Sequence, residues 1–533
     1  MAAMRKRFSS VCSSSSTEED NASLYDSVPI SATDPSSEQE HPYAALLCCH
    51  RVQDSLLSSN SSFTGYRGVL NWIIILLVLS HAHLLLENFI QHGFLIDVKK
   101  VLEHLIEDNC NWPSVNLILA ANMFAIVALL LERSQEKVTL LHFLCFSYFD
   151  HVYPGLENAS TTNISNFSTQ NNCPGKHQHF YSIYSHQGML SPTTSHRLHL
   201  INLGLLLLFP AAVIVHEHTI STGGAFFSLW FYTALGMKLY SYQETNRWYR
   251  QAHLTDAERD KDHPVAPKAF NEQLTFRDLY YFLFAPTLCY QRDFPCTPKV
   301  RINKLLHRLL EMVIVIQIMV GIVQQWIEPI FQRSENSFSS MDITMRVEHL
   351  VGLVAPTHFL WLLFFFLCHS YLNFLAELMR FGDRHFYGDW WNATTLINFW
   401  ENWNIPFQKW CHRHVYTRLV EKNVPPSRAE LVVFLMSAAL FEYMIALPLH
   451  SCRLWIFLMM LVELLVAVFL ANYFQGNYGN GLVWLCLLLG PLLAVSTYFH
   501  DHYISLHHHH HQSLCSPLTS GHGLPGAVFL QLH

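Results

Sequence analysis

Long apolar runs recur along this chain, each close to the length that crosses a lipid bilayer as a helix. A helix needs about 20 predominantly apolar residues to span the hydrocarbon core. Only 14% of the residues are charged, compared with about 25% in soluble domains. We therefore predict an all-α polytopic membrane protein with about nine transmembrane helices, at Leu70–Gln91, Ser114–Leu131, Leu198–Val215, Ala225–Tyr242, Leu305–Ile327, Leu350–Leu372, Leu431–Leu449, Leu454–Phe474 and Gly481–Phe499.

Basic residues are distributed unevenly between the predicted loops. Cytosolic loops of membrane proteins carry an excess of lysine and arginine. The loops after Tyr242 and after Leu372 are rich in both residues, whereas His216–Gly224 contains neither. We expect the two basic loops and the N-terminus to be cytosolic. An odd number of spans then places the C-terminus in the lumen.

Three segments differ from the apolar body, which we assign to residues 66–503. Residues 1–65 are rich in serine, acidic residues and proline, a composition typical of disordered segments. No apolar run follows Arg5-Lys6-Arg7, so we expect no cleavable signal peptide. A polar cytosolic insert covers about 132–197, and residues 504–533 form an atypical tail.

The chain shows no pattern of a metal or cofactor site. Its 13 cysteines lack the paired spacing of a zinc site or a disulfide framework. His507–His511 is interpreted as part of a low-complexity tail. We predict no metal, no cofactor and no nucleic-acid partner.

One predicted cytosolic loop concentrates indole rings and positive charge. Five tryptophans lie between Phe386 and Tyr416, together with Lys409 and Arg413. Tryptophan at the end of an apolar run is typical of the membrane–water interface, and arginine and lysine bind phosphate groups. The loop predicts an interfacial lid over a site for an anionic ligand.

The residue order in this loop resembles a known family pattern. It reads Phe386-Tyr387-x-Asp389-Trp390-Trp391-Asn392, then Asn402-Trp403-Asn404-Ile405-Pro406. This is similar to the signature of the sterol and diacylglycerol branch of the membrane-bound O-acyltransferases, nearest to the type 1 diacylglycerol subfamily. The likeness runs with gaps from His50 to about Tyr503.

The resemblance implies a fold, a location and substrates. It implies helices around an intramembrane reaction chamber in the endoplasmic reticulum membrane. The implied partners are fatty acyl-CoA and diacylglycerol as substrates, the surrounding membrane lipids, and further copies of the chain in a homo-oligomer (dimer or tetramer). The stretch Arg51–Ser62 is implied to help hold two subunits together.

The resemblance also implies which side chains meet acyl-CoA. Phosphates need cationic donors, and adenine stacks on aromatic rings. The implied acyl-CoA-binding residues are Tyr387, Asp389, Trp390, Trp391, Asn392, Trp400, Asn404, Lys409, Arg413, His414, Tyr416 and Ser437. The alternative is that the loop only anchors the protein at the interface.

Polar side chains inside the predicted spans are candidates for the lining of a substrate tunnel. Such residues are rare in membrane helices and are functional candidates by default. The candidate tunnel residues are Gln317, Gln324, His369, Glu463, Gln475 and Asn477. The alternative is that each satisfies a hydrogen bond between helices.

The seventh span raises a chemical problem. Ser427 and Glu430 have the spacing of a capping box at its start. Ester formation needs a base that removes the hydroxyl proton. The resemblance places the catalytic histidine at position 441, which is Phe441 here, beside two other implied catalytic positions, Glu442 and Asn404. A phenyl ring cannot accept a proton, and Glu442 projects about 100° away around the helix.

Other departures accompany Phe441. Glu463 and Pro491 stand where the resemblance leads us to expect glutamine. His369 is a histidine at membrane depth and the one replacement base that we can name. Two hypotheses follow: a diacylglycerol acyltransferase, or a catalytically silent protein that binds acyl-CoA or lipid. A sterol-type acceptor is disfavoured by Lys409-Trp410-Cys411, and a transporter by the lack of broken-helix charge patterns.

Overall fold

The computed structural model describes residues 55–56, 68, 72, 90, 93, 112–152, 191–217, 220–259, 274–332, 342–451, 453–470, 473–474 and 476–515. Within these ranges the backbone is largely helical, and one isolated bridge joins Cys296 to Phe381. The longer helices are α6 (Trp112–Val152), α8 (Pro192–His216), α9 (Thr222–Arg259), α11 (Ile302–Ile322), α13 (Ile343–Leu378), α17 (Pro426–Ala446), α18 (Trp455–Leu470), α19 (Gly476–Leu489) and α20 (Pro491–Cys515). The shorter ones are α10 (Phe276–Phe284), η3 (Val323–Ile327), α12 (Glu328–Gln332), η5 (Trp390–Asn392), α14 (Leu396–Trp403), α15 (Ile405–Cys411), η6 (His412–Tyr416) and α16 (Thr417–Glu421).

The predicted polytopic helical architecture is confirmed, but the count of nine spans is not. In the described part of the chain, six helical segments are long and apolar enough to cross a membrane, and Trp455–Leu470 is a shorter apolar helix. The predicted span Ala225–Tyr242 lies in α9, whose second half is polar and which is not among the six. Apart from Trp72 and Ile90, the predicted span Leu70–Gln91 lies outside the described residues.

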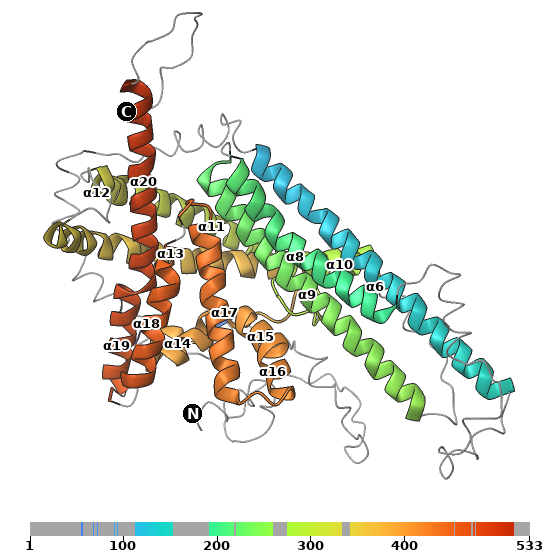
Figure 1. Cartoon of the computed structure of the whole chain (residues 1–533). Coiled ribbons are helices and arrows are strands. Elements are labelled where there is room, and N and C mark those ends of the chain that lie inside the picture. The colour runs from blue at the N-terminus through green and yellow to red at the C-terminus, as the bar shows by residue number, and fades with distance from the viewer. Residues whose placement is uncertain are drawn as a thin grey trace, which may run out of the picture.

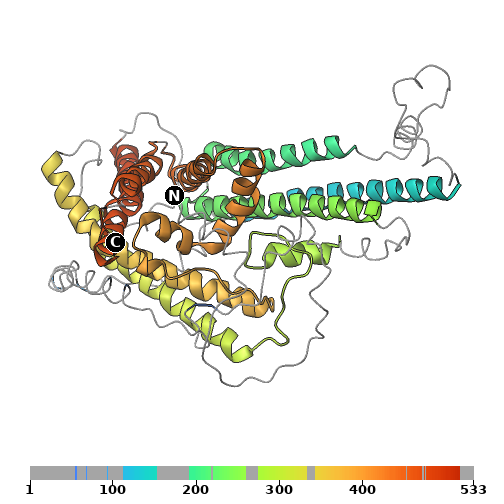
Figure 2. The same cartoon turned by 90° about the horizontal axis from the view of Figure 1, so that it is seen from below.

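The helices form three groups around a centre of short helices (Figure 1). Helices α6, α8 and α9 pack against one another, α11 packs along α13, and α18 packs against both α17 and α20. Helices α14, α15 and α16 lie between these groups when the molecule is seen from below (Figure 2). The loop that carries the tryptophans is therefore built into the body of the protein.

Local capping explains where the central short helices begin. The Thr395 side chain accepts a hydrogen bond from the Asn398 backbone N–H at 3.1 Å, which caps α14. The Asn404 side chain accepts from the Phe407 N–H at 3.3 Å, which caps α15. Both contacts satisfy amides that a helix start leaves free. The prediction that Ser427 caps the seventh span was wrong, because α17 begins at Pro426 with Pro425 as N-cap and no side-chain cap.

Helix α10 is the short aromatic helix at Phe276–Phe284. Thr275 caps its start by accepting from the Asp278 N–H at 3.2 Å. At its other end, the Lys238 ammonium donates to the carbonyl oxygens of Phe282, Leu283 and Ala285 at 2.7 to 3.0 Å. A cation at a helix C-terminus satisfies free carbonyls and opposes the helix dipole. Lys238 therefore fixes α10 against α9.

Candidate active site

The segment 386–393, which we call the signature loop, is buried and clamped from two sides. Trp390 and Trp391 are both buried in an aromatic cluster. The Asn480 amide, on α19, donates to the carbonyl oxygens of Trp391 at 3.0 Å and Ala393 at 2.8 Å. The Asn392 side-chain oxygen accepts from the Gly68 N–H at 2.9 Å. A Cβ at Gly68 would lie 2.2 Å from the Trp391 carbonyl oxygen, so only glycine permits this approach.

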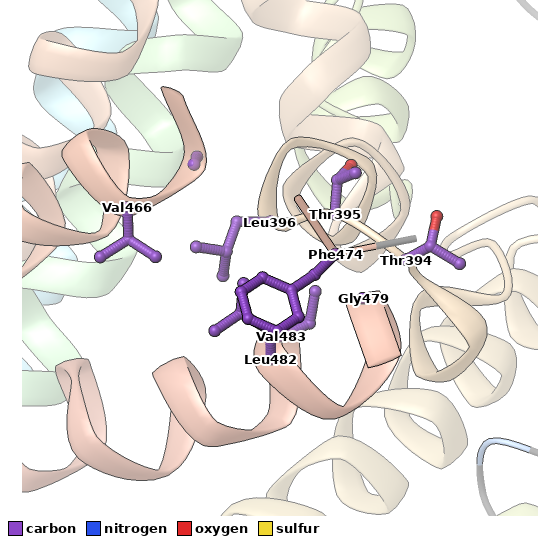
Figure 3. Close-up of a pocket in the computed structure, with 9 residues that line it drawn as sticks. Thr394, Thr395, Leu396, Val466, Phe474, Gly479, Leu482 and Val483 are labelled. Atoms are coloured by element: carbon purple, nitrogen blue, oxygen red, sulfur yellow. The ribbon is translucent and has the colours of Figure 1, made fainter. Parts of the chain in front are cut away.

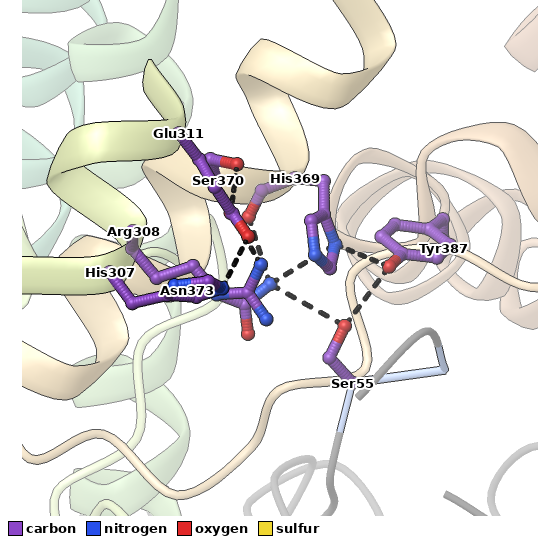
Figure 4. A network of polar contacts seen from close by, with 8 residues as sticks. All are labelled: Ser55, His307, Arg308, Glu311, His369, Ser370, Asn373 and Tyr387. Atoms are coloured by element: carbon purple, nitrogen blue, oxygen red, sulfur yellow. Dashed lines mark hydrogen bonds and ion pairs between the residues drawn. The ribbon is translucent and has the colours of Figure 1, made fainter. Parts of the chain in front are cut away.

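A polar network holds the start of the signature loop (Figure 4). The Tyr387 hydroxyl lies 2.5 Å from His369 Nδ1 and 3.0 Å from the Ser55 hydroxyl. The Asn373 amide donates to the His369 carbonyl oxygen at 2.8 Å and reaches the Ser55 hydroxyl at 3.4 Å. Within the same view, Ser370 donates to Glu311 at 2.8 Å. The structure thus brings together two predicted site residues, His369 and Tyr387, and adds Ser55 and Asn373, which were not predicted.

The predicted cationic residues of the loop face groups of their own chain. Lys409 pairs with Asp383 at 3.0 Å. Arg413 donates to the Tyr290 carbonyl oxygen at 2.8 Å, and its guanidinium lies 5.0 Å from the Trp248 ring centroid. Their contact with the phosphates of acyl-CoA stays a prediction.

His414 is a buried member of the same region. It is 3% exposed, its Nε2 lies 2.9 Å from the Ser241 hydroxyl, and its ring stacks on Trp248. Burial, with the nearby guanidinium groups of Arg413 and Arg418, holds the pKa of His414 well below its usual value. The ring is therefore neutral at physiological pH, and binding of coenzyme A by this group stays a prediction.

The remaining predicted binding residues have varied surroundings. Asn404 is exposed and caps α15, and Asp389 and Trp400 are half-buried. Tyr416 stacks on His412 with ring centroids 5.1 Å apart. The Ser437 hydroxyl donates to the Val433 carbonyl oxygen at 2.8 Å, within its own helix.

The predicted tunnel residues are not gathered in one place. Gln317 is exposed on α11 and Asn477 is exposed at the start of α19, while Gln324 is half-buried in η3. Gln475 lies outside the described residues, and Pro491 opens α20. A tunnel role for this set stays a prediction.

Phe441 packs into an apolar cluster between α17, α18 and α20. Its ring centroid lies 6.3 Å from that of Trp400, and the cluster includes Met460 and Tyr498. Nothing in this setting gives the phenyl ring a role in proton transfer.

The carboxylate of Glu442 accepts hydrogen bonds from three donors. One carboxylate oxygen accepts from the backbone N–H groups of Ile456 and Phe457, each at 3.1 Å, and the other accepts from the Tyr498 hydroxyl at 2.5 Å. The carboxylate thus caps the start of α18, where free amides and the helix dipole favour negative charge. This arrangement supports a structural role for Glu442, and its predicted catalytic role stays untested.

The carboxyl group of Glu463 differs from that of Glu442 in its hydrogen bonding. This residue lies on α18, is 4% exposed, and neither of its carboxyl oxygens accepts a hydrogen bond of normal geometry from a described residue. The indole of Trp400 faces the carboxyl. A Cβ at Gly490 would lie 2.6 Å from Glu463 Oε1, so the carboxyl occupies the space that glycine leaves at the break between α19 and α20.

An apolar pocket lies beside the signature loop (Figure 3). It is lined by Thr394, Thr395, Leu396, Val466, Ala467, Phe474, Gly479, Leu482 and Val483. Val466 and Ala467 are three and four residues after Glu463 on α18, so they share its helix face. The pocket therefore lies about one helical turn from the buried carboxyl.

Known proteins of one family resemble this chain in sequence. The model of MBOAT, the membrane-bound O-acyltransferase family, matches residues 185–500. This chain belongs to the membrane-bound O-acyltransferase family. Diacylglycerol O-acyltransferase 1 of Homo sapiens is 40% identical over 463 residues, which cover 86% of this chain and 85% of the relative. The protein of the same name from Bos taurus is 39% identical over 467 residues (86% and 85%), and diacylglycerol O-acyltransferase 1C of Glycine max is 29% identical over 498 residues (90% and 86%).

Two residues that hold the signature loop, Asn480 and Ser55, were not selected from the sequence. Asn480 lies in the stretch Phe474–Asn480, and Ser55 lies in the stretch Arg51–Ser62. Both stretches resemble the family in sequence, but neither the asparagine nor the serine has a spacing that would single it out. Only the folded contacts show that each stretch contributes one side chain to the signature loop.

Proposed function

We propose that this chain transfers the acyl group of a fatty acyl-CoA to diacylglycerol in the endoplasmic reticulum membrane. The observation that supports this most is the frame of the signature loop, in which Tyr387, Asn392 and Trp391 are held by segments from distant parts of the chain. The names of its relatives supply the acceptor and the product class. An acyltransferase needs such a rigid frame because reacting atoms must be held in near-attack geometry.

The proposed reaction forms an ester from an alcohol and a thioester and needs no cofactor. The hydroxyl oxygen of diacylglycerol attacks the thioester carbonyl carbon, the C–S bond breaks, and the hydroxyl proton is transferred to the coenzyme A thiolate. A base on the protein lowers the barrier by holding that proton. The apolar helices around the site exclude the water that would otherwise hydrolyse the thioester.

A second function has a specific observation in its favour. Phe441 lies in an apolar cluster, and the carboxylate of Glu442 is fully engaged at the start of α18. A protein with this centre and no other base would bind fatty acyl-CoA without transferring it. This silent binder would belong to the same family and would act through its association with acyl-CoA or membrane lipid.

One experiment separates the two functions. The purified full-length protein in lipid nanodiscs is given radiolabelled oleoyl-CoA and dioleoylglycerol, and triacylglycerol is measured. Binding of oleoyl-CoA is measured in parallel by its effect on thermal stability. Triacylglycerol above the protein-free background supports transfer. Binding without triacylglycerol, together with activity gained in Phe441→His, supports the silent binder.

The topology and assembly belong to the same proposal. The excess of basic residues in the loop that follows α9 and in the loop between α13 and α17 supports a cytosolic position for both. We propose a cytosolic N-terminus, a lumenal C-terminus and a homo-oligomer. Protease protection of tagged termini in sealed microsomes tests the first two, and mass photometry of the nanodisc particles tests the third.

A further inference from the structure

In the described part of the chain, Glu463 is the one residue with two buried carboxyl oxygens that accept no hydrogen bond of normal geometry, and the indole N–H of Trp400 is a donor that faces them. An isolated charge in an apolar interior is costly. A chain that only needed packing at this point would place an apolar side chain on α18, as it does at the flanking positions Val462 and Leu464. The position of Glu463 therefore calls for a chemical explanation.

Trp400 and Met460 connect the Glu463 carboxyl to the apolar cluster that contains Phe441. Glu463 is three residues after Met460 on α18, and Met460 packs in the same cluster as Phe441. Trp400 connects the two positions, because its ring lies 6.3 Å from the Phe441 ring and its indole faces the Glu463 carboxyl. Cys486, on α19, also faces the carboxyl. These contacts separate the Glu463 carboxyl from the Phe441 ring by one side chain, that of Trp400.

The other ionisable candidates are already engaged. The oxygens of Glu442 accept from Ile456, Phe457 and Tyr498. His369 Nδ1 is engaged with the Tyr387 hydroxyl at 2.5 Å (Figure 4). Of the two carboxyl groups, that of Glu442 is fully engaged, whereas the oxygens of Glu463 face only the Trp400 indole among the donors named above.

We propose that Glu463 is the general base of this acyltransferase, in place of the histidine that Phe441 replaces. This inference rests on the proposed function. The Glu463 carboxylate removes the proton of the acceptor hydroxyl as the hydroxyl oxygen attacks the thioester carbonyl carbon. The tetrahedral intermediate expels coenzyme A as the thiolate, which takes the proton back from the Glu463 carboxylic acid. One C–O bond forms, one C–S bond breaks, and the carboxylate is regenerated.

The apolar pocket lies about one helical turn from Glu463. Val466 and Ala467 line it one turn beyond Glu463, and Thr394 and Thr395 line it from the end of the signature loop (Figure 3). The pocket residues Val466 and Ala467 thus share one face of α18 with Glu463.

The test uses the full-length protein in nanodiscs with oleoyl-CoA and dioleoylglycerol. Glu463→Gln keeps the shape of the side chain but removes the base, and we expect kcat to fall by about 100-fold or more, with oleoyl-CoA affinity unchanged. Glu463→Asp should retain part of the rate. The wild-type rate should decline as the pH is lowered and the carboxylate takes up a proton, whereas the residual rate of Glu463→Gln should not follow that profile. Glu421→Gln, which removes an exposed carboxylate, is the matched control.

A rescue variant separates proton transfer from packing. In Phe441→His combined with Glu463→Gln, an imidazole supplies the base, and we expect turnover well above that of Glu463→Gln alone. A double variant that binds oleoyl-CoA but is no faster than Glu463→Gln would overturn the assignment, as would full activity of Glu463→Gln. Wild-type protein that binds oleoyl-CoA but makes no triacylglycerol would overturn both this assignment and the proposed transfer. Wild-type activity that Glu463→Gln leaves intact would overturn the assignment alone.

Discussion

The signature loop and the centre around Phe441 lie on either side of Trp400, which packs against both, and they treat polar groups in opposite ways. In the loop, the Tyr387 hydroxyl, the Asn392 side chain and the carbonyl oxygens of Trp391 and Ala393 all have partners. At the centre, Trp400 contacts both the Phe441 ring and the buried Glu463 carboxyl, whose oxygens accept no hydrogen bond of normal geometry from a described residue. These acceptors of the loop are satisfied, although the Trp390 indole N–H has no partner among the described residues, whereas the carboxyl that we propose as the base accepts no hydrogen bond of normal geometry.

The largest effect is expected from Glu442, which belongs to the frame although it adjoins the centre in sequence. Glu442→Ala removes a charged acceptor from the amides of Ile456 and Phe457 and from Tyr498. Because each hydrogen bond to a charged group contributes about 1.5–3 kcal/mol, we expect a loss of roughly 3–5 kcal/mol in the free energy of unfolding. Thermal unfolding in detergent measures it. Glu442→Gln keeps an acceptor and should lose less stability. Equal stability of Glu442→Ala and wild type would show that Glu442 does not stabilise the start of α18.

A smaller loss is expected at the clamp on the loop. Asn480→Leu leaves the carbonyl oxygens of Trp391 and Ala393 without their shared donor. Unpaired buried acceptors cost about 1–3 kcal/mol, and the melting temperature should fall accordingly. Asn477→Leu, at an exposed position on the same helix, is the stability control. A melting temperature unchanged by Asn480→Leu would mean that the signature loop keeps its conformation without the Asn480 hydrogen bonds.

The network at Tyr387 should show a smaller effect again. Tyr387→Phe removes the hydroxyl that contacts His369 and Ser55, and we expect about 1 kcal/mol of destabilisation. Tyr478→Phe, at a residue that is 81% exposed, is the control. The same melting curves, followed by intrinsic fluorescence, report both variants. His369→Ala tests whether His369 acts as the base instead of Glu463. In that case it would abolish triacylglycerol synthesis, whereas a structural His369 would lower only the stability.

The smallest effect concerns pH. His414 has a lowered pKa in the folded protein, because of burial and then the charges of Arg413 and Arg418, while an unfolded histidine titrates near about 6.5. Its contribution to stability is therefore complete above that pH and is lost as the pH falls below it. Between pH 7.5 and 5.5, wild type should lose about 1 kcal/mol more stability than His414→Phe. His307→Gln, at an exposed histidine, controls for general titration, and parallel pH curves for wild type and His414→Phe would contradict the prediction.

Much of the fold followed from the sequence because hydrophobic length is a local property. The spans at Ser114–Leu131, Leu198–Val215, Leu305–Ile327, Leu350–Leu372, Leu431–Leu449 and Gly481–Phe499 correspond to apolar helices of the structure. The start of α17 was misread because Pro425 and Pro426 set it without any help from the Ser427 hydroxyl.

The sequence by itself determined that this is a helical membrane protein of an acyltransferase family and that Phe441 cannot serve as a base. It could not determine which polar side chains are free, because hydrogen-bond partners are distant in sequence. Asn480 and Trp391 are 89 residues apart, and Ser55 and Tyr387 are 332 residues apart. Only the tertiary structure showed that Glu442 is occupied by the start of α18 while the oxygens of Glu463 accept no hydrogen bond of normal geometry from a described residue, since that distinction depends on how α17, α18 and α20 pack.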